Sequence, residues 1–151
     1  MKNFKLFQRG VAAVEFALTM FVLLLIGAGL AEFGRAIWYY DAIVRGTRDA
    51  ARQLSSVPTS GLAAATAATA AVVVDTATAG GVPDFSSANV TVTCAPAACA
   101  AATLPADVTR VTVSASYPLQ LGALFPFIVS QKSGSNWSVT LAPHTTMPTM
   151  W

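Results

Sequence analysis

The chain has 151 residues, of which 54% are hydrophobic and only 11% are charged. Because a typical soluble domain carries about 25% charged residues, this chain is too apolar to be an ordinary soluble protein. The formal net charge is +2, and the basic residues do not gather with aromatic residues in one patch, so nothing indicates nucleic-acid binding.

The first predicted element is a helix that crosses a membrane at residues 11–31. Between Phe16 and Ala31 no residue is charged and only Thr19 has a polar side chain. A helix over residues 11–31 is about 31 Å long, which matches a hydrocarbon core of about 30 Å. We therefore expect a single crossing.

Residues 1–10 form a basic leader ahead of this helix. The leader contains Lys2, Lys5 and Arg9 and no acidic residue. The positive-inside rule places such a leader in the cytoplasm, so the rest of the chain is expected outside. Arginines that follow the helix weaken this argument, although acidic residues are interleaved with them.

Gly10 and Glu15 distinguish this helix from an ordinary anchor. Gly10 stands at the boundary between the leader and the apolar run, and Glu15 lies inside the run. A carboxylate at that depth costs on the order of 1–3 kcal/mol unless a cation pairs with it. Two interpretations stay open. Glu15 marks the headgroup edge and the crossing starts at Phe16, or Gly10 and Glu15 act together.

The residues around Gly10 resemble a known processing site. The run reads Arg9-Gly10-x-x-Ala13-Val14-Glu15-Phe16-Ala17-Leu18. It resembles the processing site of TadE-like pseudopilins of the tight-adherence (Flp) pilus system, and the similarity continues at residues 29–35 and 48–52. Many members have a proline near the middle of the helix, where this chain has Thr19-Met20-Phe21. The resemblance implies that a prepilin peptidase cuts after Gly10, which frees the amine of Val11, with Glu15 and Phe16 in the same site.

The resemblance also implies a role and a location. The chain is expected to be a minor pilin or assembly factor in the bacterial inner membrane, with its C-terminal domain periplasmic or extracellular. The implied partners are the lipid bilayer, the prepilin peptidase, other pilins or pseudopilins, and inner-membrane pilus assembly proteins. Two competing classes remain: a secreted protein cut by signal peptidase after Gly29-Leu30-Ala31, and a membrane-anchored binding or sensor module.

Residues 32–54 are predicted to continue the membrane helix outward as an amphipathic extension. Apolar and small residues recur at spacings of three and four and mark one helix face. This predicted packing face consists of Phe33, Ile37, Tyr40, Val44, Thr47, Ala51 and Leu54, widened by Ala36, Ile43 and Ala50. It is expected either to cover the chain's own outer domain or to contact neighbouring subunits, and the sequence does not choose between these.

Residues 55–151 are expected to form a small α+β domain outside the membrane. The segment Ser55–Gly61 breaks the first helix, and an alanine-rich second helix is predicted over Leu62–Thr78. Alternating residues then predict three antiparallel strands, which start near Asn89, Arg110 and Trp137, and Pro118 is expected to end the second of these. The two helices are expected to cover the apolar face of the sheet.

Cys94 and Cys99 are the only cysteines. An even number of cysteines with four residues between them, in an oxidising compartment, favours a disulfide. Zinc is the competing interpretation, but two cysteines without a nearby histidine provide too few ligands. The apolar run at residues 119–129 is left open between core, membrane and partner contact.

No catalytic motif, metal motif or cofactor fingerprint is recognisable in the chain. His144 is the only histidine, and no nucleophile or acid motif surrounds it. The chain is therefore expected to be neither an enzyme nor a cofactor-binding protein. Asn89-Val90-Thr91 and Asn136-Trp137-Ser138 match the glycosylation sequon, but so short a pattern is common by chance.

Overall fold

The protein was analysed as a computed structural model, which describes residues 3–122 and 138–150, with side chains from residue 11 onward. The chain divides at Arg35 into an N-terminal unit and a C-terminal unit, and the C-terminal unit comprises Ala36–Leu121 and the last strands. Each unit is described by itself below.

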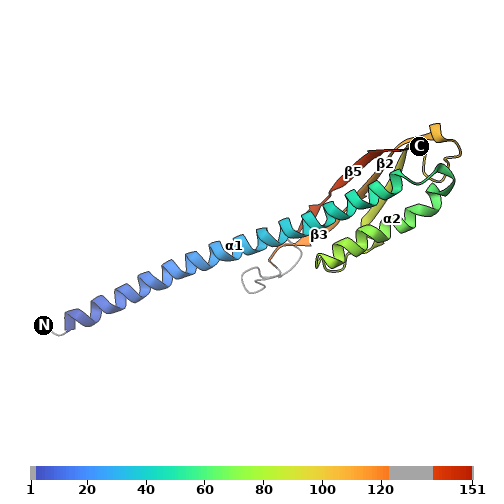
Figure 1. Cartoon of the computed structure of the whole chain (residues 1–151). Helices are drawn as coiled ribbons and strands as arrows, with labels where there is room; N and C mark the ends of the chain where they lie inside the picture. The colour runs from blue at the N-terminus through green and yellow to red at the C-terminus, as the bar shows by residue number, and fades with distance from the viewer. Residues whose placement is uncertain (1–2, 123–137, 151) are drawn as a thin grey trace. The chain divides into compact units, whose positions relative to one another are not determined.

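Helix α1 runs from Asn3 to Ser55, and helix α2 runs from Thr59 to Ala79 (Figure 1). The predicted break after the first helix is confirmed, because Pro58 interrupts the backbone hydrogen bonding between α1 and α2. At its other end, α2 stops where the Gly80 N–H bonds to the Thr76 carbonyl and Gly81 takes a left-handed φ of 78°. Glycine adopts that conformation without a steric penalty.

Five strands form two antiparallel sheets. In the larger sheet, β1 (Val90–Pro96), β2 (Val108–Ala115) and β5 (His144–Pro148) lie in the order β1-β2-β5. In the smaller sheet, β3 (Tyr117–Gln120) pairs with β4 (Ser138–Leu141). Short 3-10 helices, η1 (Ser87–Asn89) and η2 (Pro105–Asp107), precede β1 and β2. The predicted α+β class, with two helices and a small antiparallel sheet, is confirmed.

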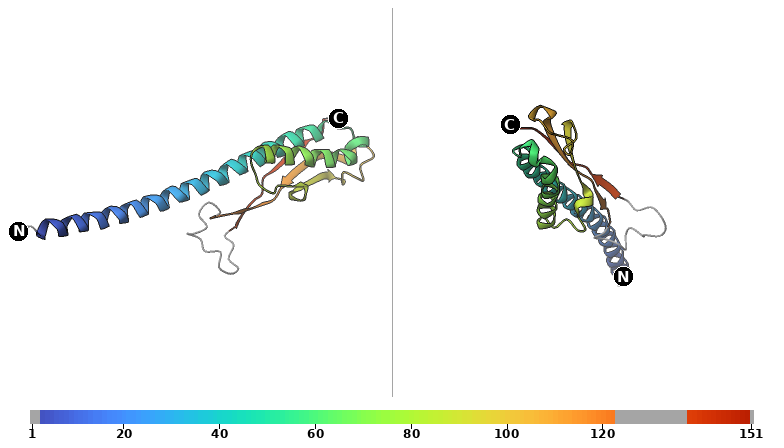
Figure 2. Two further views of the ribbon diagram at one scale, coloured as in Figure 1. Left: turned by 90° about the horizontal axis from the view of Figure 1, so that it is seen from below. Right: turned by 90° about the vertical axis from the view of Figure 1, so that its right-hand side faces the viewer.

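The C-terminal unit has two layers. The second half of α1 and α2 lie side by side against one face of the larger sheet (Figure 2). In β2, Val111 and Val113 are fully buried under these helices, whereas Arg110 and Thr112 point to the other face. The alternation that predicted the strands therefore also separates the covered face from the open one.

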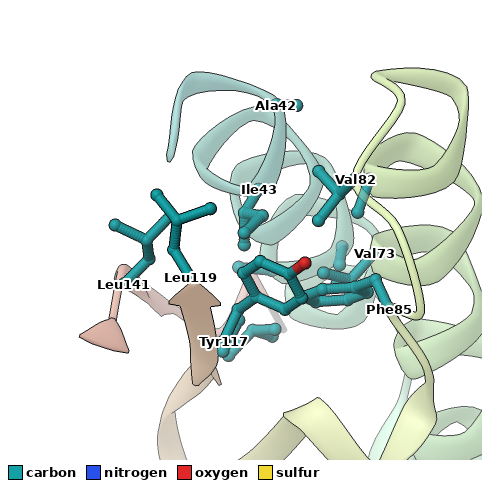
Figure 3. Packing of buried hydrophobic residues seen from close by; sticks show 13 residues of the cluster. Ala42, Ile43, Val73, Val82, Phe85, Tyr117, Leu119 and Leu141 are labelled. Carbon is teal, nitrogen blue, oxygen red and sulfur yellow. The ribbon is translucent and has the colours of Figure 1, made fainter. Parts of the chain in front are cut away.

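The core contains residues from α1, α2, β2, β3 and β4 and from the loop that follows α2. Figure 3 shows Ile43 of α1, Val73 of α2 and the aromatic rings of Phe85 and Tyr117 converging on one point. The two ring centroids are 5.9 Å apart, within the range of favourable aromatic pairs. The Tyr117 hydroxyl donates a hydrogen bond to the Pro83 carbonyl at 2.9 Å. That bond satisfies the one polar atom that this buried ring brings into the core.

Helices α1 and α2 approach each other closely at two glycines. A Cβ added to Gly46 would lie 3.2 Å from the Val73 Cα, and one added to Gly80 would lie 2.5 Å from the Ala42 Cβ. Because real Cβ atoms do not approach to 2.5 Å, the helix pair requires a residue without a side chain at Gly80.

The prediction that Pro118 ends the second strand is wrong. Pro118 lies inside β3, opposite Thr140 of β4. The ladder from β2 continues into β3 with the same register, and the Ala115 N–H bonds to the Pro143 carbonyl. Hydrogen-bonded pairs alternate along such a ladder, so the Pro118 nitrogen points away from β4 and needs no proton.

Two other details differ from the sequence-based expectations, and some expectations are not tested. The second helix begins three residues earlier than predicted, at Thr59. A further strand, β5, follows β4 and was not predicted. The expected turn at residues 132–135, the residue Trp137 and the apolar positions 123–129 lie outside the described residues. Within the described part of that apolar run, Leu119 is buried and Leu121 packs against the core.

Candidate functional site

The apolar segment of α1 has its large side chains in the open. Residues that any water-soluble fold would bury are exposed here, for example Phe16 at 67% and Leu24 at 67%. From Val11 onward α1 is long and apolar enough to cross a membrane, and so is α2. The two differ in burial, since α2 packs Leu62 and Val73 into the core. The exposed segment of α1 is therefore compatible with a membrane anchor.

The predicted processing residues lie within the continuous helix α1. Gly10, Val11, Glu15 and Phe16 are all helical, and Val11, Glu15 and Phe16 are exposed. The Thr19 hydroxyl donates to the Glu15 backbone carbonyl at 2.8 Å. Among the described side chains, none forms an ion pair with the Glu15 carboxylate. The described chain thus leaves Glu15 available to a group outside it.

An ion pair follows the end of the apolar segment. The Arg35 guanidinium lies 2.6 Å from the Glu32 carboxylate, one helical turn away. Opposite charges at this spacing support a helix. Transfer of a charged side chain into hydrocarbon is energetically unfavourable, so Glu32 and Arg35 mark the end of the segment suited to lipid.

The six predicted helix-packing residues separate into two groups. Ala51 and Leu54 are fully buried in the core of the C-terminal unit. Phe33, Ile37 and Tyr40 are exposed, at 67%, 54% and 46%. Val44 is half-buried between them. The predicted packing face is therefore shared between the protein's own core and an apolar strip that no described residue covers.

Trp38 is a residue whose contact the sequence did not indicate. Its indole Nε1 donates to the Gly80 carbonyl at 2.8 Å, across 42 positions of the chain. The ring borders a cleft of about 270 Å³ that also involves Asp41, Arg45 and Thr76. Asp41 and Arg45 form an ion pair one turn apart, and the pKa of Arg45 is raised by its hydrogen bond to Asp41 and by the charge of that carboxylate. No sequence pattern links Trp38 to Gly80, because the bond depends on how α1 and α2 pack.

Cys94 and Cys99 form a disulfide, with Cα atoms 5.0 Å apart. The bridge joins the end of β1 to the loop that follows. Cys99 is buried against Leu54, Leu62 and Val108, so the bridge ties this loop to the core beneath both helices. The spacing of the cysteines was a sufficient signal for this pairing.

The carboxylate of Asp107, at the end of the same loop, is held by backbone hydrogen bonds. The Asp107 carboxylate accepts hydrogen bonds from the backbone N–H groups of Thr103 at 2.8 Å and Leu104 at 2.7 Å. These bonds, first that from Leu104, favour the ionised form and lower the pKa of Asp107. Asp107 thereby orders the turn that leads into β2.

The described residues contain no group of three or more His, Cys, Asp or Glu side chains that could hold a metal ion. His144 is exposed at the start of β5. Asn89 has a structural role, because its side chain donates to the Ser116 carbonyl at 2.9 Å and accepts from the Ser86 N–H.

Residues 10–52 match the family described as TadE-like protein. No curated protein and no solved structure was found to match the chain. The matched residues begin at the glycine that precedes the apolar segment and end near the buried end of α1. Residues 10–52 are therefore a TadE-like segment, and the chain is consistent with a TadE-like protein of a pilus system.

Proposed function

We propose that this chain is a pseudopilin-like minor component of tight-adherence pilus assembly. The observation that carries the proposal is the TadE-like match over residues 10–52, which includes both the exposed apolar segment and the glycine ahead of it. In this proposal residues 1–10 are a cytoplasmic leader, residues 11–31 cross the inner membrane once, residues 32–54 extend the helix, and residues 55–151 form the outer domain.

A prepilin peptidase removes the leader by cutting after Gly10. Prepilin-type processing uses a glycine at the cytoplasmic face of the membrane, a retained apolar helix and an acidic residue a few positions later. Gly10, the segment 11–31 and Glu15 have these properties. The cut creates a positively charged amine on Val11, four residues before Glu15, whose carboxylate forms no ion pair with a described side chain.

That amine and Glu15 form a pair, within one chain or between neighbours. A buried carboxylate is strongly destabilising alone, and a cation of opposite charge in a low-dielectric setting offsets the cost. Such a pair between chains orders the helices along a common axis. The exposed residues Phe33, Ile37 and Tyr40 support the same role, since contact with a neighbouring helix would remove them from water.

Glycines in the apolar segment, and one just after it, support helix-to-helix contact. Gly27, Gly29 and Gly34 have no neighbouring atom within 4 Å of an added Cβ, so the described chain gives no packing reason for them. Each glycine costs a helix about 1 kcal/mol relative to alanine. Small residues let membrane helices approach closely, which explains why glycines occur here.

The experiment that tests the proposal is identification of the first residue of the mature chain. Peptide mass mapping of membrane-extracted protein, from cells that carry the cognate peptidase, is expected to give Val11. Gly10→Ala is expected to leave the precursor uncut with its helix still inserted. A chain that starts at Glu32 would identify a signal peptide, and one that retains Met1 would identify a simple anchor. Either result would overturn the pseudopilin proposal.

A second experiment separates the role of Glu15 from processing. Glu15→Gln removes the charge and keeps the size of the side chain. We expect it to leave insertion intact and to reduce co-purification with other pilus components. Unchanged co-purification and normal piliation would contradict the pairing of Glu15 with the Val11 amine and leave the cleavage site untouched.

A further inference from the structure

The larger sheet of the C-terminal unit ends at β1 on one side. In the part of the chain that the structure describes, β1 pairs with β2 only. The Ser116 N–H donates to the Asn89 carbonyl at 2.8 Å just before β1 begins. Hydrogen-bonded pairs alternate along an antiparallel ladder, so this bond defines which residues of β1 direct their backbone groups toward β2 and which direct them away.

Val90, Val92 and Cys94 direct their backbone N–H and C=O groups to the open side of β1. The Val90 N–H already bonds to the Ser87 carbonyl at the end of η1. Among the described residues, the hydrogen bonds outside the regular helices and strands do not involve the Val90 carbonyl or the backbone groups of Val92 and Cys94. The sequence of β1 contains no charged residue. Natural edge strands usually carry charges or prolines that prevent pairing. Pro148 ends β5 on the opposite edge and Pro96 ends β1, but the stretch of β1 from Val90 to Cys94 has neither a charge nor a proline.

A cleft runs along this open edge, beside α2. Its volume is about 370 Å³, and it is lined by Val92 and Cys94 of β1, by Ala63 and Thr66 of α2, and by Ala98 of the disulfide loop. All of these side chains are small or apolar and none is charged. The edge of β1 and one face of α2 are therefore neighbours on the same side of the unit.

That face of α2 is itself an exposed surface of alanines. Between Ser60 and Asp75, which are themselves exposed, the exposed positions of α2 are all alanines: Ala63, Ala64, Ala67, Ala68 and Ala71. No charged residue occurs in α2 before Asp75. A helix that faces only water normally presents charged or polar residues there. Small side chains instead allow two helices to approach to the short end of the usual 8–10 Å range.

We propose that a second copy of this chain pairs with β1. The two β1 strands run antiparallel about a two-fold axis near Val92, so Val92 faces Val92 of the second copy and Val90 faces Cys94. The two sheets join into one, and the alanine faces of the two α2 helices meet above it. The uncharged β1 strand places no like charges opposite each other across the axis.

A second copy fits both surfaces, and a lone strand from another protein fits only one. Adding a strand would satisfy the backbone groups at the edge of β1. It would leave the alanine face of α2 open, because that face needs a second helix at the same height above the sheet. The two-fold operation that pairs β1 with itself supplies that helix automatically. This inference does not depend on the proposed role in pilus assembly.

Cysteine cross-linking of the full-length chain tests the predicted register. In the proposed dimer Thr91 faces Thr93 of the second copy as a non-hydrogen-bonded pair, with Cα atoms about 4.5 Å apart, which a disulfide can bridge. Both side chains lie on the exposed face. Cells would co-express one tagged chain with Thr91→Cys and a differently tagged chain with Thr93→Cys.

We expect a mixed disulfide dimer in the membrane fraction, at a yield about tenfold above that of either variant alone. The control pairs Thr91→Cys with Thr146→Cys, which lies on β5 at the other edge, and is expected to give no dimer. Absence of the mixed dimer under oxidising conditions would overturn the proposal. Cross-linking to a protein of a different mass would also overturn it, since the occupant would then be another subunit.

Charge at the alanine face provides the second measurement. Ala67→Glu places two carboxylates near each other across the axis and is expected to lower the mixed-dimer yield about tenfold. Gln53→Glu adds the same carboxylate at an exposed position of α1 and is expected to leave the yield unchanged. Equal yields for Ala67→Glu and the parent chain would show that the α2 helices do not meet, and would contradict the two-fold arrangement.

Discussion

The apolar segment of α1 and helix α2 satisfy the same criterion of length and composition for crossing a membrane. They use different residues to do so. Residues 11–31 contain leucines and phenylalanines that are exposed all around the helix. Helix α2 is mostly alanine, threonine and valine, and it buries Leu62, Thr69, Val73 and Ala77 along one face. Among the described residues, nothing covers the apolar surface of residues 11–31, whereas α2 packs against the sheet.

This difference teaches that apolar composition alone does not assign a helix to lipid. The free energy of transfer scales with apolar area, at about 0.8 kcal/mol for each buried CH₂. Alanine has little apolar area, so transfer of α2 into lipid would contribute little free energy. Packing of one face of α2 against the sheet is enough to hold the helix in place. The leucines and phenylalanines of residues 11–31 have large areas on every side, which only a lipid environment or neighbouring helices can cover.

The largest expected effect comes from truncating one leucine in each helix. Leu62→Ala opens a cavity in the core of the C-terminal unit and is expected to lower its free energy of unfolding by about 2–5 kcal/mol. Leu24→Ala is the matched change at an exposed position of α1 and is expected to leave that free energy unchanged. Denaturant unfolding in detergent, followed by near-ultraviolet circular dichroism, measures both. Equal effects would break the comparison.

A charge in each helix tests which one enters the membrane. Phe21→Arg, near the centre of residues 11–31, is expected to make insertion less favourable by about 3 kcal/mol. Ala64→Arg lies on the exposed face of α2 and is expected to have no effect on insertion. The membrane fraction that resists alkaline extraction reports the outcome. A loss of insertion with Ala64→Arg would mean that α2 also enters lipid.

A smaller effect is expected from adding one methyl group at a glycine. Gly80→Ala would place its Cβ 2.5 Å from the Ala42 Cβ, and separating the helices is expected to cost about 1–3 kcal/mol. Gly27→Ala meets no atom within 4 Å and is expected to leave unfolding of the C-terminal unit unchanged. Thermal unfolding of the two variants compares them. A stable Gly80→Ala variant would show that α1 and α2 are less tightly packed than described.

The smallest expected effect is the pH dependence that Asp107 contributes. Its pKa is lowered in the folded chain by the hydrogen bonds from Leu104 and Thr103. The stabilisation is therefore complete above the unfolded pKa of about 3.9 and is lost as the pH falls through the lower folded pKa. Asp107→Asn lacks the stabilisation by the ionised carboxylate, so it is expected to melt below the parent chain near neutral pH. The two melting temperatures are expected to approach each other in acid.

Measuring melting temperature against pH for both chains checks this sign. Glu15→Gln, in the N-terminal unit, serves as the control and is expected to leave the profile of the C-terminal unit unchanged. A difference between Asp107→Asn and the parent chain that grows toward low pH would contradict the assignment.

Much of the fold was predictable because its signals are local. The end of α1, the glycines after α2 and the alternation of Val111 and Val113 in β2 each follow from a few adjacent residues. Strand β5 was missed because His144–Pro148 shows little apolar alternation, and only Met147 has a large apolar side chain among its inward residues. The cysteine pair was found because two cysteines at that spacing leave one short loop.

The candidate site was less predictable. The processing residues Gly10 and Glu15 form a local pattern, so the sequence could indicate them, and they stay a prediction. The bond from Trp38 to Gly80 and the exposure of Ile37 and Tyr40 could not be predicted. Both depend on which face of α1 meets the sheet, and residues spaced by three and four fit either of two adjacent faces.

The sequence by itself determined that residues 16–31 are apolar on every side, that two helices precede alternating strands, and that Cys94 can reach Cys99. These properties depend on the order of neighbouring residues and on the local geometry of the backbone. Only the tertiary structure decided that Ile43 lies inside while Tyr40 lies outside, and that β1 is left at the edge beside the alanines of α2. The physical reason is that the burial of a helix face and the pairing of a strand edge both depend on contacts between segments that are distant in the chain. Which contacts form is decided by the packing of the whole unit.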